Sequence, residues 1–238
     1  MEEKTSGIVL GGTNYGENDK ILSIFTLEQG VVSAKIKGVK KAGAKLKFAS
    51  EPFCFAEYVF ASKGGMRTVT GASLIDSFYP VREDIRRFFA AGAMLEFVRK
   101  FVKEGIISSE MFVLLLNSLK SISYGKLDPG GILACFLLSA LKLSGYGLGF
   151  GDCAECGSRF INRVFFDYAR GAFICEKCFN GEGREINLST FLYLKKADGG
   201  EPPDGENALK PLKLLDFYIS VKAEENIKSL KELIKIWE

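Results

Sequence analysis

Residues 20–38 read KILSIFTLEQGVVSAKIKG, and this stretch decides the fold class of the first third of the chain. Apolar and polar residues alternate in Lys20–Phe25 and again in Ala34–Lys37, which is the period of half-buried β-strands. A turn signal, Gln29-Gly30, separates the two runs. The stretch therefore predicts two strands joined by a turn, each with one apolar face.

Three further segments have the same β-rich character and are bounded by turn residues. They are SGIVLGGTNY at residues 6–15, FCFAEYVFAS at 53–62 and RTVTGASLIDS at 67–77. Five short strands in so short a segment fit a small closed or partly closed barrel, and the OB-fold is the leading form of that architecture. We therefore predict a five-stranded OB-fold barrel over residues 1–79.

The hydrophobic period changes at Pro80, and the rest of the chain is mainly helical in pattern. Between residues 81 and 102 the apolar positions recur every three to four residues, as in an amphipathic helix. The same period, with capping and stop signals, predicts helices at 109–121, 128–144, 209–221 and 227–237. We predict an α+β protein in which residues 80–150 and 186–238 form one α-helical domain.

Four of the six cysteines form a C-x2-C-x18-C-x2-C pattern: Cys153, Cys156, Cys175 and Cys178. This spacing is typical of a zinc site, because each pair can direct two sulfurs at one ion and two pairs complete a tetrahedron. Four thiolates leave no open coordination position, so the site is predicted to be a structural Zn²⁺ site, on a motif at residues 151–185 inserted in the helical domain. Another metal or cluster, a disulfide and free thiols are the alternatives.

The composition argues against catalysis and against a membrane span. The chain has no histidine, which removes the commonest general base, and it shows no compact carboxylate cluster for Mg²⁺ chemistry. We therefore predict no catalytic residues and no enzyme activity. Since no apolar run approaches the roughly 20 residues of a membrane helix and the start of the chain lacks a signal pattern, a cytoplasmic location is expected.

Positive charge is concentrated in KIKGVKKAGAKLK, residues 35–47. The chain as a whole carries a net charge of +3, so the six lysines of this stretch leave the other residues with a net charge of −3. The stretch follows a strand of the predicted barrel, near the face that OB-folds use for oligonucleotides. The predicted DNA contacts are Lys35, Lys37, Lys40, Lys41, Lys45 and Lys47. Ordinary solvated surface is the alternative.

Other side chains could add to a DNA surface. Tyr15, in a turn beside Gly16, is a candidate for base stacking, although a structural role is the alternative. Arg82 and Arg86 form a second basic cluster where the predicted barrel ends. A polar helix face, neutralised by nearby acids, explains these two arginines equally well.

Read in order, several short motifs resemble the family of the bacterial DNA repair and recombination mediator RecO. The first is YGENDKIL at residues 15–22, the second DSFYPVREDI at 76–85, and the third Gly145-Tyr146 ahead of the cysteine pairs. The resemblance extends over nearly the whole chain, and the order of the motifs is more specific than any one of them. It implies an OB-fold, a helical domain and an inserted zinc motif.

The resemblance also implies what the protein does. It implies binding of single- and double-stranded DNA, annealing of complementary strands, and help in loading RecA, together with RecR, onto strands coated with single-strand-binding protein. A contact with the C-terminal tail of single-strand-binding protein and a place at the nucleoid are implied in the same way. The alternative is a zinc-stabilised module for protein–protein interaction that does not bind DNA directly.

Overall fold

The computed structural model describes residues 2–161, 163–181, 183–203 and 207–238. The chain divides into two compact units, whose boundary passes through helix α1 (Ile85–Phe101). The barrel unit comprises Met1–Asp84 and Leu95–Ser123, and the helical unit comprises Ile85–Met94 and Tyr124–Glu238. The domain limits predicted at 79 and at 151–185 stay predictions.

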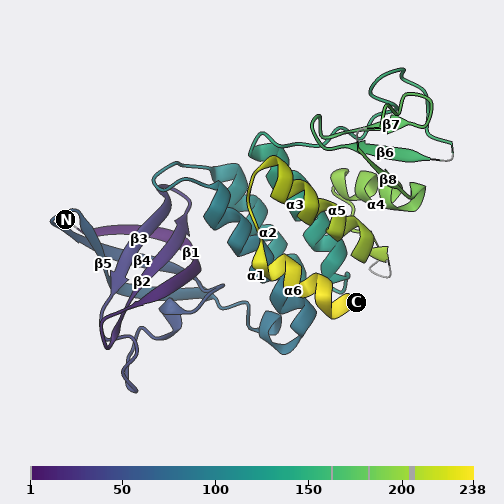
Figure 1. Cartoon of the computed structure of the whole chain (residues 1–238). Coiled ribbons are helices and arrows are strands. Elements are labelled where there is room, and N and C mark those ends of the chain that lie inside the picture. Colours follow the sequence, from purple (N-terminus) through teal and green to yellow (C-terminus); the bar gives the residue numbers. More distant parts are fainter. Residues whose placement is uncertain (1, 162, 182, 204–206) are drawn as a thin grey trace. The chain divides into compact units, whose positions relative to one another are not determined.

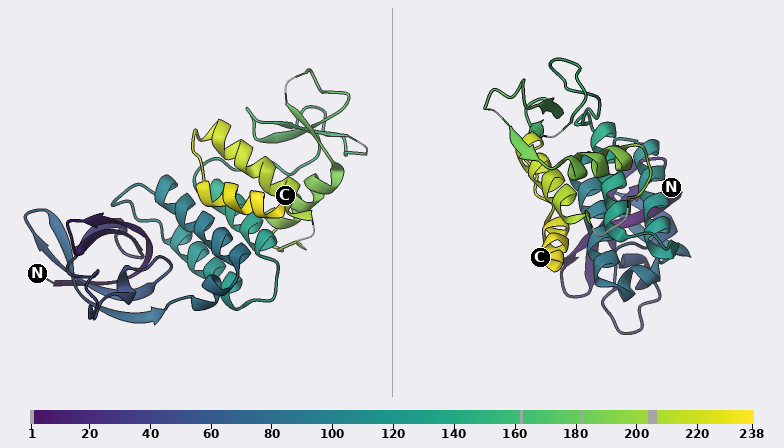
Figure 2. Two further views of the ribbon diagram at one scale, coloured as in Figure 1. Left: turned by 60° about the horizontal axis from the view of Figure 1, so that its bottom comes forward. Right: turned by 90° about the vertical axis from the view of Figure 1, so that its right-hand side faces the viewer.

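Five strands close into a barrel in the barrel unit (Figures 1 and 2). They are β1 (Glu2–Tyr15), β2 (Asp19–Thr26), β3 (Gly30–Ile36), β4 (Phe55–Lys63) and β5 (Met66–Asp76). The order around the barrel is β1-β2-β3-β5-β4, and only the β3–β5 pair is parallel. The predicted five-stranded, OB-like barrel is confirmed. Strand β1 begins at Glu2, earlier than the sequence pattern indicated.

The alternation in residues 20–38 fills the barrel interior. Leu22 lies opposite Ala34 and Ile24 lies opposite Val32 in the antiparallel β2–β3 pair, and all four side chains are buried. Because side chains in a strand point alternately to its two faces, this register places the apolar set of both strands in the core. The register of this pair therefore follows from the sequence pattern.

Helix α2 (Ser109–Tyr124) contributes to the core of the barrel unit. The ring of Phe112 contacts Phe25 of β2 and Phe55 of β4 edge to face, with centroid distances of 5.4 and 6.2 Å. Ahead of α2, the backbone N–H of Ser33 donates to the Glu104 carboxylate at 3.0 Å. Helix α2 thus packs against the barrel strands through aromatic contacts, which add to the free energy gained by burying apolar area.

The helical unit contains α3 (Pro129–Leu143), α4 (Leu188–Asp198), α5 (Leu209–Lys222) and α6 (Lys228–Trp237), together with the start of α1. Asp128 caps α3 by accepting a hydrogen bond from the Gly130 N–H at 2.7 Å, and Pro129 lies in the first turn, where its missing N–H costs no hydrogen bond. A small sheet of order β7-β6-β8 completes the unit, from β6 (Val164–Asp167), β7 (Ala172–Cys175) and β8 (Arg184–Ile186).

One helix boundary was predicted wrongly and one helix was missed. The helix predicted to start at residue 81 starts at Ile85, because Tyr79–Glu83 forms a 3-10 turn around Pro80. Helix α4 was not predicted, although Asn187 before it and Gly199 after it are usual boundary residues. Among the helices of the described residues, none combines the length and apolar character needed to cross a membrane.

Asp216 on α5 gives a first testable consequence of this packing. Its Oδ1 is buried and has no hydrogen-bond partner among the described residues, and burial raises the pKa of this carboxyl, with Lys231 partly opposing the shift. Asp216→Asn is therefore expected to raise the free energy of unfolding at pH 7 by about 0.5 kcal/mol, a small value because the side chain is only partly buried.

The sign of the pH dependence follows from the raised pKa. Above that pKa the folded protein holds an unfavourable charge, whereas near the ordinary value of 3.8 the carboxyl binds a proton more readily in the folded than in the unfolded chain. The advantage of the asparagine should therefore shrink as the pH falls toward 4 in denaturant titrations. Glu201→Gln, at an exposed position, is the control. A loss of stability in Asp216→Asn would contradict the account.

Candidate metal centre and nucleic-acid interface

The four predicted cysteines come together in the helical unit. The Sγ atoms of Cys153, Cys156, Cys175 and Cys178 all lie within 4.8 Å of one another, and those of Cys156 and Cys175 are 3.8 Å apart. The first pair lies in the loop before β6, and the second pair lies at the end of β7 and in the turn after it. This cluster can hold a metal ion, and its four soft sulfur donors suit Zn²⁺ with a closed coordination shell.

Backbone geometry explains how each pair points its sulfurs at one place. Gly157 has a φ of 66°, a conformation that glycine adopts readily, and its N–H donates to the Cys153 carbonyl at 2.8 Å. The Cys175 N–H donates to the Cys153 sulfur at 3.3 Å, and the Cys178 N–H closes a turn onto the Cys175 carbonyl at 3.1 Å. Hydrogen bonds of the protein itself therefore connect the two cysteine pairs, independently of a bound ion.

The surroundings of the cluster favour thiolates at some of its positions. Hydrogen bonds from Ser158 lower the pKa of the Cys156 thiol to about 6, whereas hydrogen bonding with Cys156 raises the pKa of Cys178 to about 12. Phe165 and Phe179 stack beside the cluster at a centroid distance of 4.0 Å. The sulfurs therefore sit on a small apolar core, as in a structural metal site.

The lysine loop, defined as residues 37–47, is attached to the barrel by apolar side chains. Val39 is buried in the barrel core, and Leu46 and Phe48 pack against the same core. Successive turns close along it, with the N–H groups of Lys41, Ala44 and Lys47 donating to the carbonyls three residues earlier at 3.1–3.2 Å. The loop thus presents its lysines from a fixed backbone. The five exposed lysines are Lys37, Lys40, Lys41, Lys45 and Lys47.

Lys35 differs from the other five lysines. Its Nζ lies 2.9 Å from Asp19 Oδ2 and 4.4 Å from the centroid of the Tyr15 ring. Asp19 Oδ1 also accepts a hydrogen bond from the Gly38 N–H at 2.8 Å; this bond, and then that from Lys35, lowers the pKa of the Asp19 carboxyl. Lys35 lies on β3, which ends at Ile36, whereas Lys37 lies in the loop that follows the strand.

Tyr15, Lys37 and Lys41 line an open hollow of about 510 Å³ between the β1–β2 turn and the lysine loop. Tyr15 is 46% exposed, so part of its ring is accessible beside the lysines. Sequence reasoning missed the role of Asp19, whose carboxylate joins the two loops. Its position just after the Gly16 turn was the available signal, since Asp is common where side chains stabilise turns.

The two predicted arginines make contacts within the chain. Arg82 donates to the carbonyls of Ser77 and Pro52 at 2.9 and 2.7 Å and lies over the Phe53 ring. Arg86, in the helical unit, lies over the Trp237 ring at 5.9 Å. Both side chains are exposed, but Arg82 in particular stabilises the chain where β5 ends.

The chain has a closed OB-like barrel with an exposed lysine loop, followed by helices and a four-cysteine motif. These features define a two-unit protein with an OB-like barrel and a cysteine cluster that can hold a metal ion. Comparison with known protein families identifies the family of this chain. The model described as "Recombination protein O N terminal" matches residues 1–78, and that described as "Recombination protein O C terminal" matches residues 82–231. The chain belongs to the RecO family.

Curated relatives agree with this assignment. The chain is 32% identical over 186 residues to the DNA repair protein RecO of Acetivibrio thermocellus, covering 78% of this chain and 74% of the relative. It is 34% identical over 183 residues to the protein of the same name from Streptomyces griseus, covering 74% and 73%. A relative from Clostridium novyi is 27% identical over 235 residues, covering 96% and 92%. The family supports a role in DNA repair.

Proposed function

We propose that the protein is a non-enzymatic mediator of DNA repair and recombination. It binds single- and double-stranded DNA, anneals complementary strands and, with RecR, assists the loading of RecA onto strands covered by single-strand-binding protein. The C-terminal tail of single-strand-binding protein is a further partner. In this proposal the protein binds and pairs DNA strands and breaks no covalent bonds.

The observation that carries this proposal is the set of five exposed lysines on an anchored loop. The cations of these side chains would replace counterions along a phosphate backbone, and the release of those counterions supplies most of the affinity. Because the loop backbone is held by Val39, Leu46 and Phe48, little ordering entropy would be lost on binding. Positive charge between two strands would also reduce their mutual repulsion during annealing.

The remaining predicted contacts have smaller roles in this proposal. Tyr15 would stack with a base at the edge of the hollow, where Lys35 already lies over its ring. Lys35 itself, paired with Asp19, would position Tyr15 more than it would contact phosphate. Arg82, in the barrel unit, and Arg86, in the helical unit, would each add a positive charge for contacts with DNA.

The cysteine cluster would hold a structural Zn²⁺. A bound ion with four sulfur ligands would link the loop before β6 to the end of β7, and it would leave no coordination position for a substrate. In this proposal the chain's own residues bind DNA, and the metal site stabilises the fold of the helical unit.

Titration of a labelled single-stranded oligonucleotide at several salt concentrations tests the proposed function, together with an assay of complementary-strand annealing. We expect tight binding at low salt that weakens steeply as salt is added, and faster annealing than without protein. Folded protein that binds no oligonucleotide at low salt would reject the proposal in favour of a protein-interaction module. Nucleic-acid cleavage or nucleotide hydrolysis above background would contradict the absence of enzyme activity.

A further inference from the structure

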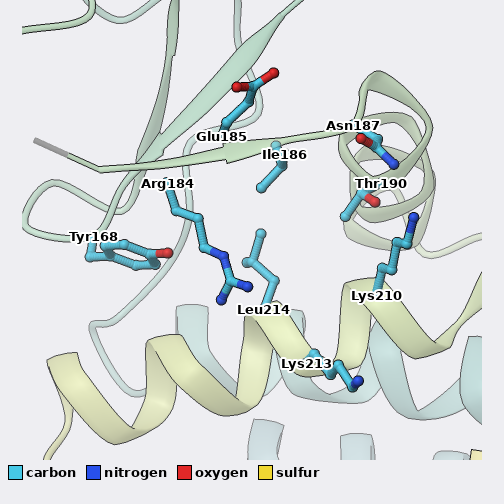
Figure 3. A pocket seen from close by; sticks show the side chains of 9 residues that line it. All are labelled: Tyr168, Arg184, Glu185, Ile186, Asn187, Thr190, Lys210, Lys213 and Leu214. Carbon is cyan, nitrogen blue, oxygen red and sulfur yellow. The ribbon is translucent and has the colours of Figure 1, made fainter. Parts of the chain in front are cut away.

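A second basic hollow lies in the helical unit, between β8, the start of α4 and the first turns of α5 (Figure 3). Its volume is about 350 Å³, which is within the usual range for small-ligand sites. Arg184 of β8 and Lys210 and Lys213 of α5 line it, above an apolar floor that includes the buried Leu214. No motif in the sequence indicated that these residues meet.

Two of the three cations have no acidic partner in the part of the chain that the structure describes. Arg184 and Lys210 form no ion pair among those residues, whereas Lys213 lies 2.6 Å from the Glu238 carboxylate. Glu185 also borders the hollow, but its carboxylate is 3.4 Å from Arg163 and points away from Arg184 in Figure 3. The hollow therefore has an excess of positive charge.

Neutral donors complete the lining. Thr190 is only 5% exposed, yet it lines both this hollow and a neighbouring one of about 210 Å³. Thr190 makes no side-chain hydrogen bond within the described residues, so its hydroxyl is available to a ligand. Asn187, at the N-cap of α4, makes no capping hydrogen bond with its side chain, and the first turn of α4 carries no acid. Because Asn187 and Thr190 both line the hollow, the positive end of the α4 dipole also faces it.

We propose that this hollow binds a phosphate group. Its donors come from three different elements and thus from several directions, which suits a tetrahedral anion with oxygens on all sides better than a planar carboxylate. The apolar floor formed by Leu214 would accept the sugar carbons next to the phosphate. The site belongs to the helical unit and does not require the lysine loop to bind DNA.

Three probes added to isotope-labelled full-length protein distinguish the sources of the phosphate: inorganic pyrophosphate, deoxyadenosine monophosphate and a short oligothymidine. Amide shifts should change in β8 and at the starts of α4 and α5. The double variant R184Q/K210Q should weaken pyrophosphate binding about tenfold or more, because two charge-assisted contacts are lost. The variant K196Q/K228Q loses the same charge at exposed positions of the helical unit and should bind pyrophosphate within about twofold of the native chain.

Each outcome of this experiment either supports or overturns the proposal of a phosphate site. Displacement of pyrophosphate by the oligothymidine assigns the site to a DNA backbone, and binding without displacement assigns it to a small phosphate compound; both support the proposal. Absence of shifts with all three probes overturns it, as does equal weakening in both double variants. Binding of an aspartate-rich peptide without binding of any phosphate would assign the hollow to protein partners and also overturn it. Melting curves of both variants confirm that each one folds.

Discussion

Replacing Lys37, Lys40 and Lys41 by glutamine should weaken the binding of a single-stranded oligonucleotide on the order of 100-fold at about 50 mM salt. Each phosphate contact contributes roughly 0.7 to the slope of log affinity against log salt, so the slope should become shallower by about 2. The three side chains are exposed, and the apolar residues that anchor the loop are unchanged. Fluorescence anisotropy at four or more salt concentrations measures both quantities.

The matched control for this variant is the replacement of Lys63, Lys103 and Lys120 by glutamine. These lysines are exposed, belong to the barrel unit and lie outside the loop, so the control loses the same net charge. If the position of the lysines in the loop determines binding, the control variant should change the affinity for the oligonucleotide by no more than about threefold. Equal weakening in the two variants would mean that overall charge alone attracts the strand, and the lysine loop would then have no special role.

The barrel could be predicted from the sequence because its strands each bury one face. In β2 and β3 the alternation of Leu22, Ile24, Val32 and Ala34 specifies both the strands and their register. Helix α4 was missed because two apolar residues lie outside its buried face: Leu188 is only half-buried and Leu192 is exposed. The contact of α2 with the barrel could not be predicted either, since it depends on distant partners of Phe112.

The candidate sites could likewise be predicted where they depend on neighbouring residues in the sequence, but not where they depend on contacts between distant residues. The cysteine cluster follows from spacing, because two residues between cysteines bring both sulfurs to one side of a turn. The pairing of Lys35 with Asp19 joins positions sixteen residues apart, and the alternation of β3 says nothing about it. The hollow at Arg184 and Lys210 depends on how β8 packs near α5, so residue type alone could not reveal it.

Replacing Cys175 by serine should remove most of the bound metal and destabilise the helical unit far more than the barrel unit. Cys175 is a buried member of the cluster and packs with Phe165 and Ile174, so the variant loses a ligand and disturbs that small core. Because structural zinc contributes on the order of 10 kcal/mol to the folding of small motifs, loss of one ligand should unfold β6–β8. Metal analysis of the reduced native protein should find one zinc ion for each chain.

Cys135→Ser is the control, since Cys135 lies on α3 in the same unit and outside the cluster. This variant should keep its zinc, whereas Cys175→Ser should lose it and lose protection from amide hydrogen exchange in β6 and β7. The barrel strands should stay protected in both variants, because no cluster ligand belongs to the barrel unit. A native chain without metal, or equal loss of protection in both units, would show that the cluster does not stabilise the helical unit through an ion.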